Sequence, residues 1–190
     1  MTTFRRGFKS WCETTALQFR TALGLKAPDP LPAERLAAHI GLRVVDIGLI
    51  PGLRAEALQQ LTVADPTSWS AVMLTLGDSK VVVVNPSHSD GRQSNDLMHE
   101  CAHVVLNHAP SKALRAATGA LMLSAYDKRQ EAEADWLAAA LLLPRAALLR
   151  IVQSGVSSEE AACQYRTSQV LLRMRLNQTG VNLQMRRRVA

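Results

Sequence analysis

The sequence predicts an α+β fold that is mostly helical and contains a small β-sheet. Aromatic residues make up 4% of the 190 residues and hydrophobic residues 47%, so the core must be built mainly from aliphatic side chains. Leu and Ala dominate, which favours packed helices over an all-β architecture. Two β-rich runs, at 69–76 and 80–84, supply the sheet. A chain of this length forms one substantial domain with extensions.

The positive charge lies mostly at the two ends of the chain. The formal net charge is +6, and basic residues cluster near the start and at Arg186-Arg187-Arg188. Basic ends can attract nucleic acid, but the middle of the chain carries no basic groove. Direct nucleic-acid binding is therefore not favoured.

The cysteines indicate a reducing compartment. Cys12, Cys101 and Cys163 form no C-x-x-C pair and are odd in number. No apolar run approaches the roughly 18 residues that a membrane span requires. We therefore expect a cytoplasmic protein that does not use a membrane as partner.

The first third of the chain alternates helical patterns with breaks. Apolar spacing predicts a helix over 10–25, followed by a stiff Pro-rich connector at 27–32. A short helix at 33–40 and a strand at 42–47 follow, and one or two helical turns are expected within 55–61.

The middle of the chain carries a hairpin and a long helix. The β-rich runs 69–76 and 80–84 flank a Gly-containing loop at 77–79, which predicts an antiparallel hairpin. The apolar stripe of the next segment predicts a helix over 91–107. We expect another helix over 111–124.

The last third is helical in pattern. The run 128–143 is rich in Ala, Leu, Glu and Arg and is closed by Pro144, which makes it the strongest predicted helix. A further helix begins at Arg145 and is interrupted at Gly155. A last helix is expected over 168–176, before a short end that does not have a clear helical pattern.

The segment His99-Glu100-Cys101-Ala102-His103 is an H-E-x-x-H pattern inside the helix predicted over 91–107. On a helix, His99 and His103 lie one turn apart on one face, where two imidazoles can bind a single metal ion. Glu100 lies about 100° round the helix, where it can reach a water on that ion and act as a base. Cys101 faces away, and His108 lacks the spacing of a three-histidine motif, so neither is a predicted ligand.

Catalytic zinc sites commonly use three protein ligands and keep one position open. The strongest predicted helix offers Glu131, Glu133 and Asp135. Glu131 and Asp135 share a face at i, i+4, so Glu131 can bind the metal while Asp135 accepts the outer N–H of a ligand histidine. Glu133 points to the opposite side and is the alternative third ligand.

Together these motifs resemble the ImmA/IrrE family of metallopeptidases, whose hallmark is H-E-x-x-H followed by E-x-x-A-[N/D]-x-[F/L]-A-A-x-L-L-x-P. The second motif is matched, with Leu where Phe is usual, by Glu131-x-x-Ala134-Asp135-x-Leu137-Ala138-Ala139-x-Leu141-Leu142-x-Pro144. The resemblance covers roughly residues 32 to 181. It implies a zincin-like metallopeptidase core with a small sheet beside the H-E-x-x-H helix, and cleavage of proteins, such as helix-turn-helix repressors.

The chain then divides into an N-terminal helix with connector at 1–31, the zincin-like core at 32–150, and a C-terminal helical region with a basic tail at 151–190. The expected site has His99, His103 and Glu131 as ligands of Zn²⁺, although the pattern does not distinguish Zn²⁺ from Mn²⁺ or Fe²⁺. Glu100 is the expected base. Tyr126 is the candidate oxyanion donor.

Two functions follow from these residues. The first is a zinc-dependent endopeptidase that cleaves a regulatory protein, such as a helix-turn-helix repressor or antitoxin, in a mobile-element or stress circuit. The second is a metal-binding docking module that regulates a transcription factor or a DNA-bound complex without proteolysis. The sequence leaves both open.

Overall fold

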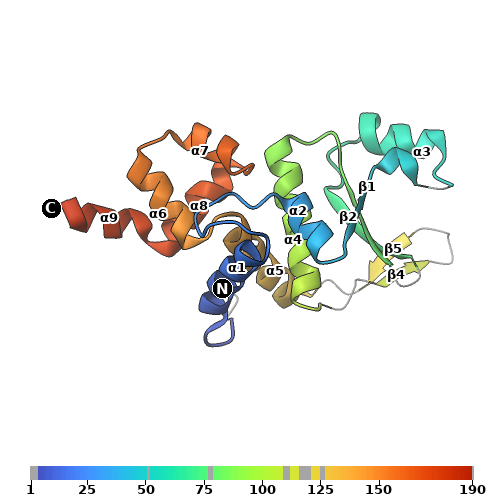
Figure 1. Cartoon of the computed structure of the whole chain (residues 1–190). Helices are drawn as coiled ribbons and strands as arrows, with labels where there is room; N and C mark the ends of the chain where they lie inside the picture. Colours follow the sequence, from blue (N-terminus) through green and yellow to red (C-terminus); the bar gives the residue numbers. More distant parts are fainter. Residues whose placement is uncertain are drawn as a thin grey trace.

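The computed structural model describes residues 4–50, 52–76, 79–108, 112–115, 121–124 and 127–189 (Figure 1). It confirms a mostly helical α+β fold. In chain order the elements are α1 (Phe8–Ala22), α2 (Ala33–His39), β1 (Arg43–Val45), the 3₁₀ turn η1 (Ile47–Leu49), α3 (Ala55–Gln59), the π turn η2 (Gln60–Ala64), β2 (Ala71–Leu76), β3 (Ser79–Val84), α4 (Asp90–Val105), β4 (Lys112–Arg115), β5 (Leu121–Ser124), α5 (Lys128–Leu142), α6 (Arg145–Ser154), α7 (Ser158–Gln164), α8 (Gln169–Thr179) and α9 (Val181–Val189).

The small sheet has the strand order β1-β3-β2. β1 runs parallel to β3, and β2 runs antiparallel to it with Met73 opposite Val82. The predicted hairpin is therefore confirmed in its pairing, while loop residues 77 and 78 lie outside the described part of the chain. β3 is the central strand and buries Val81, Val82 and Val83, which explains its run of valines without polar alternation.

Helix α4 lies between the sheet and helix α5 (Figure 1). Its apolar stripe buries Leu97, Met98 and Ala102, as the helical pattern predicted. Helix α5 packs against α4 with small and branched apolar side chains, and its Ala134 and Leu137 are fully buried. This contact fixes the rotation of both helices, and so it fixes which of their polar side chains face each other.

The end of α5 is held by the N-terminal helix. α1 packs on α5 and buries Phe8 and Cys12 in the same core. The guanidinium of Arg20 is fully buried and donates to the carbonyls of Leu141 at 2.8 Å and Leu142 at 3.3 Å. These carbonyls belong to the last turn of a helix and have no partner within it. Burial lowers the pKa of Arg20 to about 10, which still leaves it charged at neutral pH.

One predicted helix is wrong. Residues 111–124 were expected to be helical, but within this segment the described residues form an antiparallel pair of strands, β4 and β5, with Lys112 opposite Ser124. Ala and Leu favour a helix in isolation, yet strand pairing overrides such weak preferences. The sequence also places Thr118-Gly119 in the middle of the segment, where a helix is least favoured.

The C-terminal end is more helical than predicted. Residues 180–185 were described only as a short end with no helix assigned, whereas α9 spans Val181–Val189. Gly180 adopts the left-handed conformation with φ 64°, which ends α8 and lets a new helix start in another direction. Val181 is fully buried and anchors that start.

No helix in the described ranges is long and apolar enough by itself to cross a membrane. Helices α5 and α6 meet that length and composition only as a pair, across a bend of 47°. Seven of the 15 residues of α5 are buried, six of them in its last six positions from Leu137 to Leu142.

Candidate metal centre

Three side chains from α4 and α5 converge on one point. His99 and His103, one turn apart on α4, bring their Nε2 atoms to 2.9 Å from each other. Glu131, in the first turn of α5, places Oε2 3.2 Å from the Nε2 of His99 and 3.6 Å from that of His103. Two ring nitrogens and one carboxylate oxygen thus form a small triangle.

This triangle has the size that a zinc ion requires. Zinc bonds of about 2.0–2.1 Å in a tetrahedral arrangement separate neighbouring ligand atoms by about 3.3 Å. The three observed separations, 2.9, 3.2 and 3.6 Å, lie around that value. The donor set of two imidazoles and one carboxylate is one that catalytic zinc sites use. The residues therefore fit a metal ion that keeps an open fourth position.

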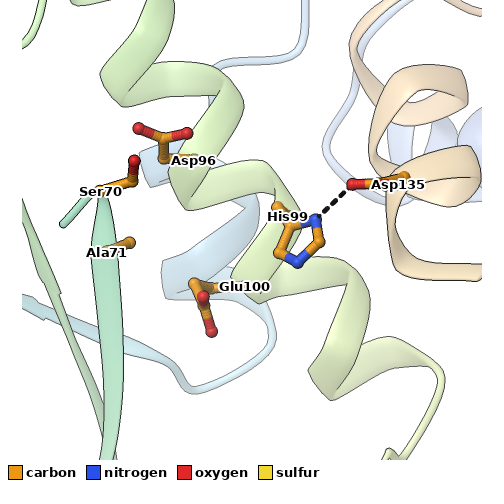
Figure 2. Close-up of a pocket in the computed structure, with 6 residues that line it drawn as sticks. All are labelled: Ser70, Ala71, Asp96, His99, Glu100 and Asp135. Carbon is orange, nitrogen blue, oxygen red and sulfur yellow. Dashed lines mark ion pairs between the residues drawn. The ribbon is translucent and has the colours of Figure 1, made fainter. Parts of the chain in front are cut away.

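His99 is oriented from α5 by Asp135. The Oδ1 atom of Asp135 lies 3.0 Å from the Nδ1 of His99 (Figure 2). Burial lowers the pKa of His99, but the hydrogen bond and charge of Asp135, with Glu100 and Glu131, outweigh burial and raise the pKa overall. When His99 donates its Nδ1–H to Asp135, its Nε2 lone pair is free to bind a metal.

His103 stands in a different electrostatic environment. Burial, together with the neighbouring imidazoles of His99 and His108, lowers its pKa to about 4. At neutral pH His103 is uncharged, so its contact with Glu131 is not an ion pair. The neutral imidazole is the form that binds metal.

Glu100 lies on the side of α4 that faces strand β2, whereas His99 faces α5 (Figure 2). It lines a cavity of about 330 Å³ whose walls also come from β2 and α5; the lining residues are Ser70, Ala71, Asp96, His99, Glu100 and Asp135. Burial raises the pKa of Glu100, with further upward contributions from nearby carboxylates. A carboxyl group with a raised pKa, next to a metal site, is suited to accept and return a proton.

The structure separates the two candidate glutamates on α5. Glu131 joins the two histidines, while Glu133 lies with Arg129, at 3.1 Å, and with the Nε2 of His108, at 3.5 Å. The side chain of Glu133 is 13% exposed, so it is mostly enclosed by the protein. Cys101 is fully buried in the core, as expected. Tyr126, the candidate oxyanion donor, lies outside the described residues.

Two features of the site were missed by sequence reasoning. His108 lies behind His103 with the two rings edge to face and their Nδ1 atoms 3.0 Å apart, although its spacing had removed it from consideration as a ligand. Asp96 lines the cavity one turn before Glu100, and it contacts the Nδ1 of His88 at 3.3 Å. Burial raises the pKa of Asp96. In the sequence, the only feature that pointed to Asp96 was its position four residues before Glu100, on the same face of the helix.

The comparison with known families agrees with this geometry. A sequence model of the peptidase M78 family, described as the IrrE N-terminal-like domain, matches residues 55–177, nearly two thirds of the chain. The chain belongs to this family. The predicted ImmA/IrrE assignment is thereby confirmed, and family membership indicates a function of the metallopeptidase type. No curated protein and no solved structure matches the chain.

The match spans the parts of the M78 fold that build the site. It includes the edge strand β2, helix α4 with its H-E-x-x-H pattern, and helix α5 with Glu131. Helix α1, which packs on α5, lies before the matched region. The core of this M78 protein thus includes a helix that the family match does not cover.

Proposed function

We propose that the protein is a zinc-dependent endopeptidase that cleaves a regulatory protein. The observation that carries the proposal is the triangle of His99, His103 and Glu131, of the size a zinc ion needs, in a chain of the M78 family. Glu100 lines the cavity beside this triangle, where a proton acceptor is required.

In this proposal His99, His103 and Glu131 hold the metal. Bound Zn²⁺ would polarise the scissile carbonyl and lower the pKa of water toward about 7. Glu100 accepts a proton from the attacking water at a carboxylate oxygen and returns it to the nitrogen of the leaving amine. Asp135 keeps His99 in the tautomer that leaves Nε2 free.

The neighbouring strand supports a peptide as the substrate. β2 begins at Ala71, beside the cavity, and among the described strands it pairs only with β3. One edge of β2 therefore offers backbone N–H and C=O groups to an extended chain. A peptide that pairs with this edge passes next to Glu100 and the metal ligands. We take a helix-turn-helix repressor or antitoxin, the substrate type implied by the family resemblance, as the first to test.

The substitution Glu100→Gln tests the proposal. The zinc-loaded wild type and the variant are incubated with purified helix-turn-helix repressors as candidate substrates, and cleavage is followed by mass spectrometry. Loss of the proton acceptor should slow cleavage by at least about a hundredfold, while the zinc content measured on the same samples stays equal. If the variant retains the full regulatory effect in cells and still binds zinc, the protein acts by docking and not by proteolysis.

A further inference from the structure

His103 has a partner of its own at the end of helix α4. Its Nδ1 atom, on the side of the ring away from Glu131, lies 3.0 Å from the Nδ1 of His108. The opposite nitrogen of His108, Nε2, lies 3.5 Å from Oε2 of Glu133. The other oxygen of Glu133 accepts from the Nε of Arg129 at 3.1 Å. A chain of contacts therefore runs from His103 through His108 to Glu133.

The carboxylate of Glu133, at the end of these contacts, determines which ring nitrogens of His108 and His103 carry a proton. An ionised Glu133 can only accept, so His108 must carry its proton on Nε2. A neutral imidazole has one N–H, which leaves the Nδ1 of His108 as an acceptor. His103 must then donate its Nδ1–H, and its own Nε2 is left bare. That bare nitrogen is the one that faces His99 and Glu131.

The backbone places His108 there by ending the helix. In a continuous helix, residues five apart lie about 140° apart and do not meet. Here Asn107 takes the left-handed conformation with φ 52°, the Asn107 N–H donates to Val104 and the His108 N–H donates to the carbonyl of His103 at 3.0 Å. This pair of bonds is a Schellman motif, in which Asn is accepted where Gly is usual. The motif turns the chain back, and His108 covers His103.

We propose that His108, held by Glu133, is the positioning residue for the metal ligand His103. It selects the tautomer of His103 and fixes the ring in the plane that points Nε2 at the metal. The side chain of His108 is 8% exposed, so little water competes for this contact. The inference rests on the metal site of the proposed function but not on proteolysis, and its test uses no substrate.

The first experiment measures zinc affinity by competition with a chromophoric chelator. His108→Phe removes the acceptor and should weaken zinc binding by about tenfold to a hundredfold. His108→Asn places an amide oxygen near the position of Nδ1 and should recover part of the loss. His39→Phe, the same change at an exposed histidine outside the site, should leave affinity unchanged. Equal affinities of the wild type and His108→Phe would overturn the proposal.

A spectroscopic signature separates positioning from general destabilisation. With Co²⁺ in place of zinc, the visible absorption bands report the geometry of the ligands. His108→Phe should alter these bands, while the bands of His108→Asn stay close to those of the wild type and the metal-free melting temperatures of the variants stay similar. Unchanged bands in His108→Phe would contradict a positioning role.

Substitutions at Asn107 change the position of His108 without changing the His108 side chain. Asn107→Gly keeps the left-handed conformation and should retain affinity, whereas Asn107→Val disfavours it and should lower affinity about as far as His108→Phe does. If Asn107 acts through His108, the double variant Asn107→Val/His108→Phe should be little weaker than either single one. Additive losses would show that the turn matters for another reason and would refute the proposed link.

Discussion

The two sides of the metal site are supported in different ways. On one side, His99 is oriented by Asp135, whose side chain is 72% exposed. On the other side, His103 is backed by His108 and Glu133, whose side chains are 8% and 13% exposed. Solvent and salt screen the charge of the exposed Asp135 strongly, whereas the contacts behind His103 are enclosed by protein and are screened less. The two ligands should therefore respond differently to mutation, salt and pH.

The largest loss of zinc affinity should come from a change to Glu131, the ligand that contacts both histidines. Glu131→Gln replaces the carboxylate ligand and should lower zinc affinity by more than about a hundredfold, a larger loss than a change behind a ligand causes. Glu133→Gln is the matched control on the same helix, and its amide oxygen can still accept from His108, so its loss should stay below about tenfold. Chelator competition measures both. The reverse ranking would mean that Glu133 is the third ligand.

A smaller loss of zinc affinity is expected from a change to Asp135, the exposed partner of His99. Asp135→Asn keeps a hydrogen-bond acceptor for His99 but removes the charge, and zinc affinity should fall by about tenfold at low salt. Because the carboxylate is exposed, raising the ionic strength should reduce the difference between wild type and variant. The same titration of His108→Phe should show a loss that does not depend on salt. Salt-independent losses in both variants would remove the proposed contrast.

The smallest effect is a shift in the pH dependence of zinc binding in the Asp135→Asn variant. A protonated His99 cannot bind metal, and its pKa is raised above the usual value of about 6.5, so as the pH falls zinc affinity should start to drop at a higher pH than it would for an ordinary histidine ligand. Asp135 contributes to that upward shift, so in Asp135→Asn the pKa of His99 falls and the loss of zinc should move to lower pH. His103, with a pKa of about 4, should stay neutral in this range. A movement to higher pH in Asp135→Asn would contradict this account.

The sequence predicted the helical part of the site because spacing along one helix is a reliable guide to shared faces. His99 with His103, and Glu131 with Asp135, are i, i+4 pairs, and the structure places both pairs between α4 and α5. The packing of α4 against α5 was needed to separate Glu131 from Glu133. Which of two carboxylates reaches a partner helix depends on how both helices are rotated, and one helical pattern does not contain that information.

Other features depend on contacts between segments or on single backbone angles. His108 approaches His103 only because Asn107 leaves the helical conformation. The strands at 112–115 and 121–124 stabilise each other by pairing, although their composition favours helix. Arg20, far from α5 in sequence, caps the end of that helix. None of these contacts has a fixed sequence spacing, so they became visible only in the structure.

The central claim is that α4 and α5 together build one metal site from two histidines and one glutamate. X-ray absorption spectroscopy of the zinc-loaded protein at the zinc edge tests it most directly. The structure predicts two imidazole nitrogens and light oxygen ligands at about 2.0–2.1 Å, with no sulfur in the first coordination shell. A zinc–sulfur distance of about 2.3 Å, or a single imidazole, would contradict it.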